Sequence, residues 1–227
     1  MDGSRPHQSL TLPSKTTKVK TNSPLKIKEL TKKAKLFGLP ENSNLPNSSK
    51  GILDAANRSK RLLNTKELNI LCERSHCDAS KLEELQNRLP ELINEAKDNL
   101  LKKLPEITKK GGSLYPKERA EACWRDCFEF ARISIYGTAA GETNITDEEG
   151  LKAVQELYSM LEVPVDALAI CLKELQLKCR EIYSESNKKR DTELLDGCFN
   201  HLAKKMKAKI KTSTKLTHTK RKIRGGV

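Results

Sequence analysis

Apolar side chains recur every three or four residues from about residue 51 to residue 203, a spacing that places them on one face of an α-helix. The longest such run extends from about Ala79 to Leu104, and Pro90 inside it predicts a kink or a division of that helix. The same spacing predicts further helices over about 51–58, 66–74, 117–137, 148–161, 165–183 and 191–210. No stretch has the pattern of a convincing strand, and no internal repeat is found. The pattern therefore predicts an all-α bundle of about seven or eight helices.

Residues with strong capping preferences mark the ends of several of these helices. Asn64 or Thr65 is expected to cap the helix that contains KELNILCER, and Thr146 or Asp147 the helix that contains DEEGLKAVQELYSML. Pro116 stands where proline is favoured, at the opening of the helix that begins KERAEACWRD. These boundaries agree with the limits that the apolar spacing gives on its own.

Charge divides the chain into three parts. The net charge is +13, of which residues 1–49 carry +6 and residues 204–227 carry +10, so that residues 50–203 are left at −3. The first part mixes Ser, Thr, Pro, Asn and Lys, the composition of a largely disordered basic extension, although Pro24 to Phe37 could form a basic helix when bound. We therefore expect one helical domain over 50–203, with a basic N-terminal extension and a Lys/Arg-rich C-terminal tail.

The sequence argues against several classes of protein. No run of about eighteen apolar residues suggests a membrane span, and the start MDGSRPHQS lacks the apolar segment of a secretory signal. The seven cysteines are scattered, which indicates reduced intracellular thiols rather than a disulfide framework. Cys72 and Cys77 flank His76 but have no second Cys/His pair nearby, so helix packing is favoured over metal binding. His201 and His218 have no nucleophile or orienting group beside them, and we expect no enzyme.

One predicted helix, from Lys117 onward, carries an unusual set of side chains on one face. Steps of three and four residues align a cation, two thiols, a carboxylate and an aromatic ring: Arg119, Cys123, Asp126, Cys127 and Phe130. This set suits a thiol-anchored ligand that has both N–H donors and anionic groups. Two plainer interpretations stay open: Cys123 and Cys127 as packed core thiols, and Asp126 as an ion-pair partner of Arg132.

The residues around this helix resemble a known family. From Leu92 to Asp126 the chain resembles, without a gap, the allophycocyanin-type pattern of the phycobiliproteins, the globin-like light-harvesting subunits of phycobilisomes; the residues are LINEAKDNLLKKLPEITKKGGSLYPKERAEACWRD. Further positions match downstream and upstream: Arg132, Tyr136, Gly141, Thr143, Asp147, Glu148, Glu156, Tyr158, Val163, Pro164, Arg61, Leu62, Leu63, Glu67 and Leu68. The resemblance covers about 50–203 and implies a globin-like phycobiliprotein fold with extra N-terminal helices.

The resemblance implies a pigment site on the same helix. The family attaches an open-chain tetrapyrrole, phycocyanobilin or a related bilin, through a thioether to the cysteine that matches Cys123. Asp126 matches the carboxylate that accepts hydrogen bonds from pyrrole nitrogens. Arg125 matches an arginine that pairs with a bilin propionate, and Arg119 is a plausible second partner. Tyr158 matches an aromatic residue beside the terminal ring, so one covalent bilin with these five contacts is expected.

The resemblance also implies a role and partners. We expect a light-harvesting subunit that transfers excitation energy at the cytoplasmic or stromal face of the thylakoid, paired with a homologous subunit in rings and held by linker proteins. The alternative is a pigment-free interaction or regulatory protein of the antenna, acting in assembly, turnover or bilin handling. The basic tail suits an acidic protein surface or an anionic membrane. Nucleic acid is a weaker expectation because the tail, 204–227, has no aromatic residue for base stacking.

Overall fold

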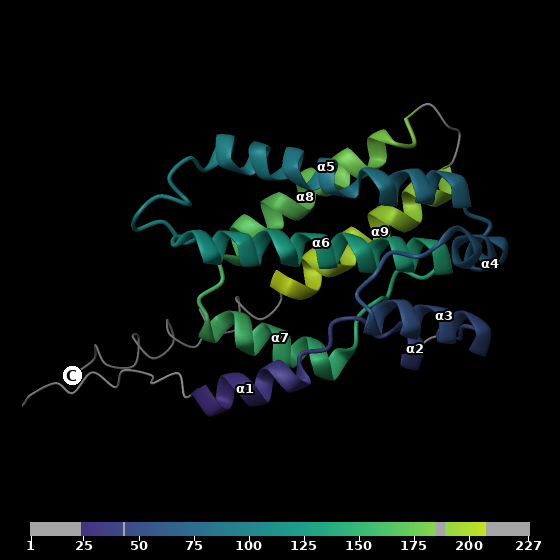
Figure 1. Cartoon of the computed structure of the whole chain (residues 1–227), viewed down its shortest axis with the longest axis horizontal. Helices are drawn as coiled ribbons and strands as arrows, with labels where there is room; N and C mark the ends of the chain where they lie inside the picture. The colour runs from purple at the N-terminus through teal and green to yellow at the C-terminus, as the bar shows by residue number, and fades with distance from the viewer. Residues whose placement is uncertain (1–23, 43, 185–188, 208–227) are drawn as a thin grey trace, which may run out of the picture.

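The computed structural model describes residues 24–42, 44–184 and 189–207, which are helical for most of their length (Figure 1). Within these ranges there is no strand, only an isolated bridge between Phe37 and Thr146. The helices are α1 Pro24–Lys33, α2 Leu39–Asn42, α3 Asn47–Arg58, α4 Thr65–Ser75, α5 Ala79–Lys103, α6 Lys117–Ala140, α7 Glu148–Met160, α8 Val165–Glu181 and α9 Lys189–Lys207. The predicted all-α class is confirmed. Helix α1 lies within Pro24 to Phe37, where the sequence allowed a basic helix, whereas α2 was not predicted.

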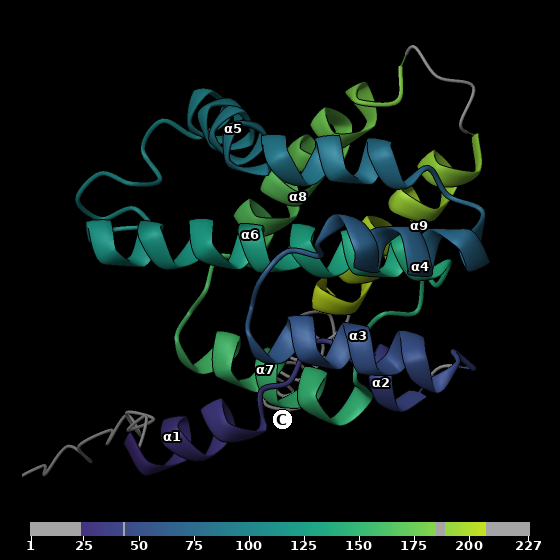
Figure 2. The ribbon, with the colours of Figure 1, turned by 45° about the vertical axis from the view of Figure 1, so that its right-hand side comes forward.

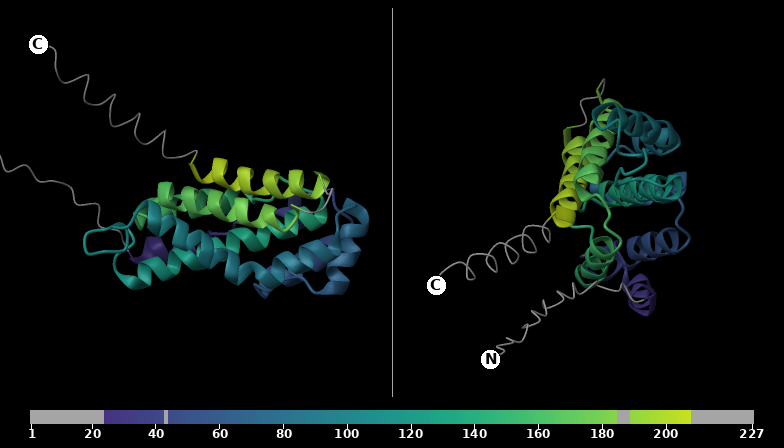
Figure 3. Two further views of the ribbon diagram at one scale, coloured as in Figure 1. Left: turned by 90° about the horizontal axis from the view of Figure 1, so that it is seen from above. Right: turned by 90° about the vertical axis from the view of Figure 1, so that its left-hand side faces the viewer.

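Helix α6 lies at the centre of the molecule. It runs between α5 on one side and α7 with α1 on the other, while α8 and α9 cross it on a common face (Figures 1 and 3). The second half of α6 is buried on all sides from Phe130 to Ala140, as its small and apolar residues allow. Gly141 ends the helix in the left-handed conformation, with φ at 75°. The helix that carries the candidate site is therefore the best-covered element of the fold.

Helix α5 continues through Pro90 without interruption in its assignment. Its two halves run in different directions, which Figure 2 shows as one half seen from the side and the other nearly end-on. A proline inside a helix removes one backbone hydrogen bond and bends the axis. Of the two outcomes expected from the sequence, the proline thus bends the helix and does not divide it.

The predicted capping residues have the expected geometry. Asn64 accepts a hydrogen bond from the backbone N–H of Glu67, whose side chain accepts one in return from the backbone N–H of Asn64. This reciprocal pair is a capping box. Asp147 caps α7 by accepting a bond from the N–H of Gly150, and Pro116 stands at the N-cap of α6. The local chemistry of the chain thus determines where these helices begin.

The N-terminal region differs from the sequence expectation. A largely disordered extension was expected over 1–49, with a basic helix possible over Pro24 to Phe37; in the structure residues 24–33 form α1, which packs on α7. We call residues 34–38 the N-terminal strap. Its backbone bonds to the segment before α7, through Gly38 N–H to Ile145 O and Asp147 N–H to Leu36 O, both at 2.9 Å. Phe37 is buried with its ring edge on Tyr136, at a centroid distance of 5.4 Å. The buried Phe37 and two backbone hydrogen bonds therefore hold the strap against the domain.

The C-terminal boundary also differs from the expected one at residue 203. Helix α9 continues to Lys207, and Met206 is buried in the core. The predicted continuation to about Ile210 lies outside the described residues. Lys189 and Arg190, which lie before the helix predicted over about 191–210, belong to the first turn of α9. None of the helices in the described ranges is long and apolar enough to cross a membrane.

Candidate functional site

Helix α6 presents the predicted stripe of side chains to the space between α6, α7 and α8. Cys123, Cys127 and Phe130 face inward and are buried, while Arg119 and Asp126 are half-buried at the margin. Buried Arg132 pairs with Glu129 at 2.5 Å, and the carboxylate of Asp126 accepts a hydrogen bond from Tyr158. The alternative of an ion pair between Asp126 and Arg132 is thus not what the structure contains.

Cys123 belongs to a row of thiols that extends into the core. Its side chain is 4% exposed, and Cys127 lies beside it with its sulfur 3.2 Å from the sulfur of Cys171 on α8. The hydrogen bond between Cys127 and Cys123 lowers the pKa of Cys123 and raises the pKa of Cys127 well above its usual range. Because the thiolate is the nucleophilic form, Cys123 is the better placed of the two to form a thioether.

Asp126 and Tyr158 form the polar contact of the site. The phenol of Tyr158, from α7, donates a hydrogen bond to Oδ2 of Asp126. Burial raises the pKa of Asp126, and the bond from Tyr158 acts against that rise. Burial and the neighbouring carboxylate also raise the pKa of Tyr158 well above its usual range. The phenol therefore keeps its proton and remains a donor at neutral pH.

A cavity of about 470 Å³ opens beside this contact. Asp126 and Tyr158 line it, together with residues of α3, of the second half of α6 and of the N-terminal strap. Its volume is within the range of small-molecule sites, about 300–1,000 Å³. Cys123 does not line the cavity; it lies one helical turn before Asp126 on α6. The structure thus brings the carboxylate and the phenol to the cavity and leaves the thiol next to it.

The two predicted arginine partners lie outside the cavity. Arg119 donates from Nη2 to the carbonyl of Leu161 at 2.8 Å and to that of Glu162, just past the end of α7. Its buried Nε has no hydrogen-bond partner among the described residues. Arg125 is exposed on α6 and does not line the cavity. Of the five predicted contacts, the structure brings Asp126 and Tyr158 into direct contact. The charge of Arg125 acts on Asp126, against the rise in its pKa, while Arg119 is bonded to the segment after α7.

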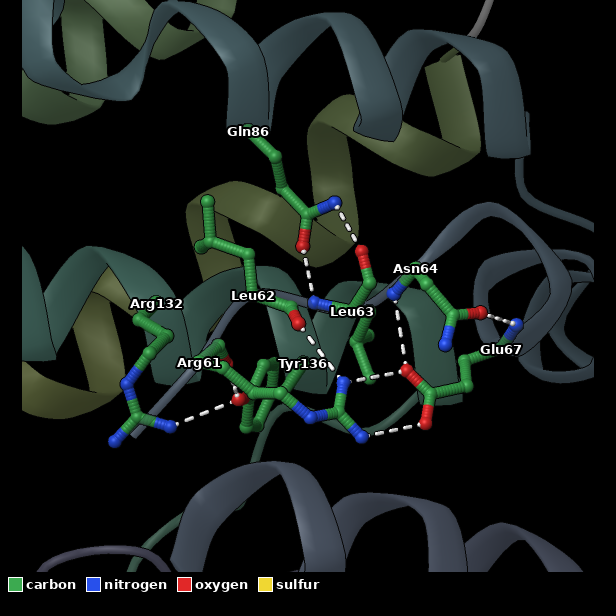
Figure 4. Close-up of polar contacts among 8 residues, drawn as sticks. All are labelled: Arg61, Leu62, Leu63, Asn64, Glu67, Gln86, Arg132 and Tyr136. Atoms are coloured by element: carbon green, nitrogen blue, oxygen red, sulfur yellow. Dashed lines mark hydrogen bonds and ion pairs between the residues drawn. The ribbon is translucent and has the colours of Figure 1, made fainter. Parts of the chain in front are cut away.

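Sequence reasoning did not assign a site role to Arg132, which lines the cavity. Its guanidinium donates to the hydroxyl of Tyr136 at 2.9 Å and to Oδ1 of Asn57 at 3.1 Å. Tyr136 in turn donates to the carbonyl of Arg61, so that α6 holds the loop between α3 and α4 (Figure 4). The resemblance marked Arg132 and Tyr136 as matching positions, but no spacing in the sequence connects them to Asn57.

The same loop is held from two further sides. Arg61 forms a two-pronged ion pair with Glu67, each N–O distance being 2.7 Å. The amide side chain of Gln86, from α5, exchanges two hydrogen bonds of 2.9 Å with the backbone of Leu63 (Figure 4). Paired hydrogen bonds of this kind fix the backbone direction as well as its position. Residues 59–64 are therefore held in place on three sides, and Lys60 among them lines the cavity.

No metal site accompanies this arrangement. Within the described ranges, no group of three or more His, Cys, Asp or Glu side chains is arranged to hold a metal ion. Cys72 is buried in the core, and the thiol of Cys77 donates to the carbonyl of Thr138 at 3.3 Å. Cys72 thus packs in the core, and Cys77 connects the loop between α4 and α5 to α6.

The polar groups of the site fit a linear tetrapyrrole. Such a pigment offers pyrrole N–H groups, carboxylates and one carbon that can bond to a sulfur. Asp126 supplies an acceptor on the cavity wall, and the unpaired Nε of Arg119 is a donor near the thiol. The row of thiols supplies the sulfur. Tyr158 bonds to Oδ2 of Asp126, which leaves Oδ1 as an acceptor for pyrrole N–H groups. Because Cys123 does not line the cavity, a thioether at its sulfur requires a local rearrangement of the wall.

Comparison with known proteins assigns the chain to a family. The sequence pattern described as "Phycobilisome protein" matches residues 51–206, which is well over half of the chain. The chain therefore belongs to the phycobilisome protein family, and its all-α fold is the globin-like fold of the phycobiliproteins. The residues that resembled the family in sequence lie inside the matched range, so the predicted family is confirmed. Helices α1 and α2 lie outside it.

Individual relatives carry allophycocyanin names. The chain is 36% identical over 85 residues to the "Allophycocyanin alpha subunit" of Picosynechococcus, a match that spans 37% of this chain and 53% of that protein. It is 31% identical over 129 residues to the "Allophycocyanin subunit beta-18" of Pyropia yezoensis, spanning 56% and 76%. With the first three relatives, the match spans about half of their length.

A solved structure is also similar to the chain. It is a far-red fluorescent biliprotein derived from a far-red induced allophycocyanin F subunit of Chroococcidiopsis thermalis. The identity is 21%, the TM-score is 0.48, and the match covers 55% of this chain and 94% of that one. The family assignment depends on the sequence matches and not on this structure.

Proposed function

We propose that the chain is a light-harvesting subunit of a phycobilisome that carries one covalently attached bilin. The observation that carries this proposal is the meeting of Asp126 and Tyr158 on the wall of a cavity, one helical turn from Cys123, in a member of the phycobilisome protein family. The bilin supplies visible absorption and excitation transfer when bound. The chain supplies the anchor, the orientation and the electrostatic environment.

Each predicted site residue has a role in this proposal. Cys123 is the thioether anchor, since its pKa is lowered relative to that of Cys127. Asp126 accepts hydrogen bonds from pyrrole N–H groups, and its buried position strengthens them. Tyr158 then packs against the pigment, which restricts its twisting. Arg119 and Arg125 are the proposed partners of the propionates, Arg119 through the Nε that has no partner among the described residues.

Assembly and location follow from the family. Relatives named as alpha and beta subunits of allophycocyanin support a homologous partner in a heterodimer, with ring assembly and linker proteins beyond it. The proposed location is the cytoplasmic or stromal face of the thylakoid in a photosynthetic cell or plastid. The basic ends of the chain, +6 over 1–49 and +10 over 204–227, would bind an acidic protein surface or an anionic membrane. No enzyme activity is proposed.

The test is to produce the full chain together with bilin-synthesising enzymes and each class of bilin lyase. We expect a visible absorption band and a bilin-sized mass increment on the peptide that contains Cys123. The variant Cys123→Ser should lose both, while the matched control Cys77→Ser, a half-buried thiol away from the cavity, should keep both. Asp126→Asn should keep the attached pigment but shift its absorption and lower its fluorescence yield severalfold, since the neutral amide no longer favours the protonated pigment.

Two outcomes would contradict the proposal. A wild-type chain that stays colourless with every lyase would leave the pigment-free antenna protein as the remaining function. Pigment found on Cys127 in place of Cys123 would overturn the assignment of the anchor while keeping the light-harvesting role. The peptide mass distinguishes these two cases directly.

A further inference from the structure

The cavity beside Asp126 takes part of its wall from a segment outside the family match. The match to the phycobilisome pattern begins at residue 51. Five of the fifteen residues that line the cavity come before it: Thr31, Ala34, Lys35, Leu36 and Phe37. They belong to the end of α1 and to the N-terminal strap, which leads from α1 to α2 (Figure 1). The rest of the wall comes from α6, α7 and the end of α3, all inside the matched range.

The strap is held in one position on the domain. Its backbone bonds to the segment before α7 on both sides of Phe37, whose ring is buried against Tyr136. Gly38 approaches the start of α7 so closely that a Cβ on it would stand 2.5 Å from the backbone nitrogen of Asp147. Because backbone hydrogen bonds and a buried ring hold the strap, it is a fixed part of the cavity wall and not a loop that a ligand displaces.

The strap presents apolar surface to the cavity. Ala34 and Leu36 line it, and both are partly buried against the hydrophobic core. Ile133 of α6 and Val154 and Leu157 of α7 line the same cavity. Sites for small organic ligands are mostly apolar, with a few polar groups that fix the orientation of the ligand. The strap therefore supplies apolar wall to a site whose polar contact lies on α6 and α7.

We propose that the N-terminal strap is a specificity-determining wall of the pigment site. Leu36 packs against the ring system of the bilin and keeps water from it, and the small side chain of Ala34 leaves the room that the rings need. This inference rests on the proposed function and assigns to the same site two residues that lie outside the family match. The strap thus selects a ligand by the space between itself and the helices.

The first experiment shortens the wall. The purified, pigment-free full chain is titrated with biliverdin, a linear tetrapyrrole, and binding is followed by visible absorption. Leu36→Ala should bind biliverdin about tenfold more weakly and release it faster, as expected when about two methyl groups no longer contact the ligand. The matched control is Leu25→Ala, because Leu25 is 78% exposed on α1 and does not line the cavity. This control should keep the wild-type affinity.

The second experiment fills the space beside the wall. Ala34→Phe should weaken the binding of biliverdin by at least about tenfold, because the added ring occupies part of the cavity. Ala55→Phe places the same ring on an exposed position of α3 that does not line the cavity, and it should bind as the wild type does. The absorption band of bound biliverdin is a further readout. In Leu36→Ala the band should shift because water reaches the pigment, whereas a strap that only supports the fold would leave the band in place.

The outcomes separate this inference from the proposed function. Wild-type affinity and an unshifted band in both strap variants would overturn the wall while leaving bilin binding intact. An equal loss of affinity in the two control variants would overturn it as well, since the effect would not be local to the cavity. If biliverdin does not bind but a lyase attaches a pigment, the band of the attached pigment gives the same comparison. If no pigment binds in either way, the proposed function fails and this inference fails with it. Circular dichroism of each variant establishes that the fold is retained.

Discussion

At the scale of single residues, the hydroxyl of Tyr158 donates the hydrogen bond that stabilises the ionised form of the half-buried Asp126. Burial raises the pKa of Asp126, while the bond from Tyr158 favours the ionised form. The contribution of that bond to stability is therefore present when the carboxylate is charged and is lost as the pH falls through its pKa. We expect Tyr158→Phe to lower the free energy of unfolding by about 1–3 kcal/mol at neutral pH, with a smaller loss near pH 4.

Urea unfolding of the wild type and of Tyr158→Phe at the two pH values checks this prediction. In an Asp126→Asn background the effect of Tyr158→Phe should no longer vary with pH, because no carboxylate remains to be ionised. A loss of stability that is the same at both pH values in the wild-type background would show that packing of the ring, and not the bond to Asp126, carries the effect.

Residue by residue, the site was predictable only in part from the sequence. Asp126 and Tyr158 came from the resemblance, and the structure brings them together although they are far apart in the chain. Lys60 and Arg132, which also line the cavity, were not assigned to the site from the sequence, because the cavity is formed by tertiary packing between α3, α6, α7 and the strap. Helical spacing orders residues along one helix and contains no information on which loop will meet its far side.

At the scale of whole elements, the sequence predicted the start of a helix correctly where a capping residue precedes it. The capping box at Asn64 and the cap at Asp147 are properties of a few adjacent residues, and the structure has them as expected. The N-terminal strap was missed for the opposite reason. Phe37 in the strap, Leu30 before it in α1 and Leu39 after it in α2 are too few and too widely spaced to predict packing on the domain, yet each is buried.

The contact between the strap and α7 depends on a glycine. Gly150 lies against the backbone carbonyl of Lys35, and a Cβ at this position would collide with that oxygen. Gly51, in α3, has open space around it. We expect Gly150→Ala to destabilise the fold by about 1–3 kcal/mol through overpacking. Gly51→Ala should stabilise it by about 0.5–1 kcal/mol, because alanine is the better helix former.

Urea unfolding measures both effects, and limited trypsin digestion locates the first. If Gly150→Ala separates the strap from α7, the lysines of residues 26–35 should be cleaved faster than in the wild type, with Gly51→Ala cleaved at the wild-type rate. Equal protection of this segment in all three proteins would mean that the strap stays on α7 despite the added methyl group, held by its other contacts.

At the scale of the whole molecule, the charge pattern and the fold place the end of the domain differently. The Lys/Arg-rich tail begins at residue 204 by composition. In the structure, Lys205 forms an ion pair with Glu148, and Met206 is 4% exposed, so α9 belongs to the domain through Lys207. Composition could not reveal this, because Lys204, Lys205 and Lys207 have the charge of the tail although they lie in a helix that packs on the domain. A deletion that starts at 204 would remove core contacts together with the charge.

A chain truncated after Lys207 isolates the electrostatic role of the tail. This cut removes seven Lys/Arg residues and no described part of the fold. Basic segments gain about 1 kcal/mol per Lys or Arg near an anionic membrane, so removing them should weaken binding to vesicles of anionic phospholipid by at least about tenfold. Binding of the full chain should also fall as salt is raised, and vesicles of zwitterionic lipid should bind neither protein. Because α9 is intact in both proteins, a change in folding cannot account for a difference in binding. If the truncated and the full chain sediment equally with anionic vesicles, the tail does not contact the membrane. An acidic protein surface then becomes the partner to test.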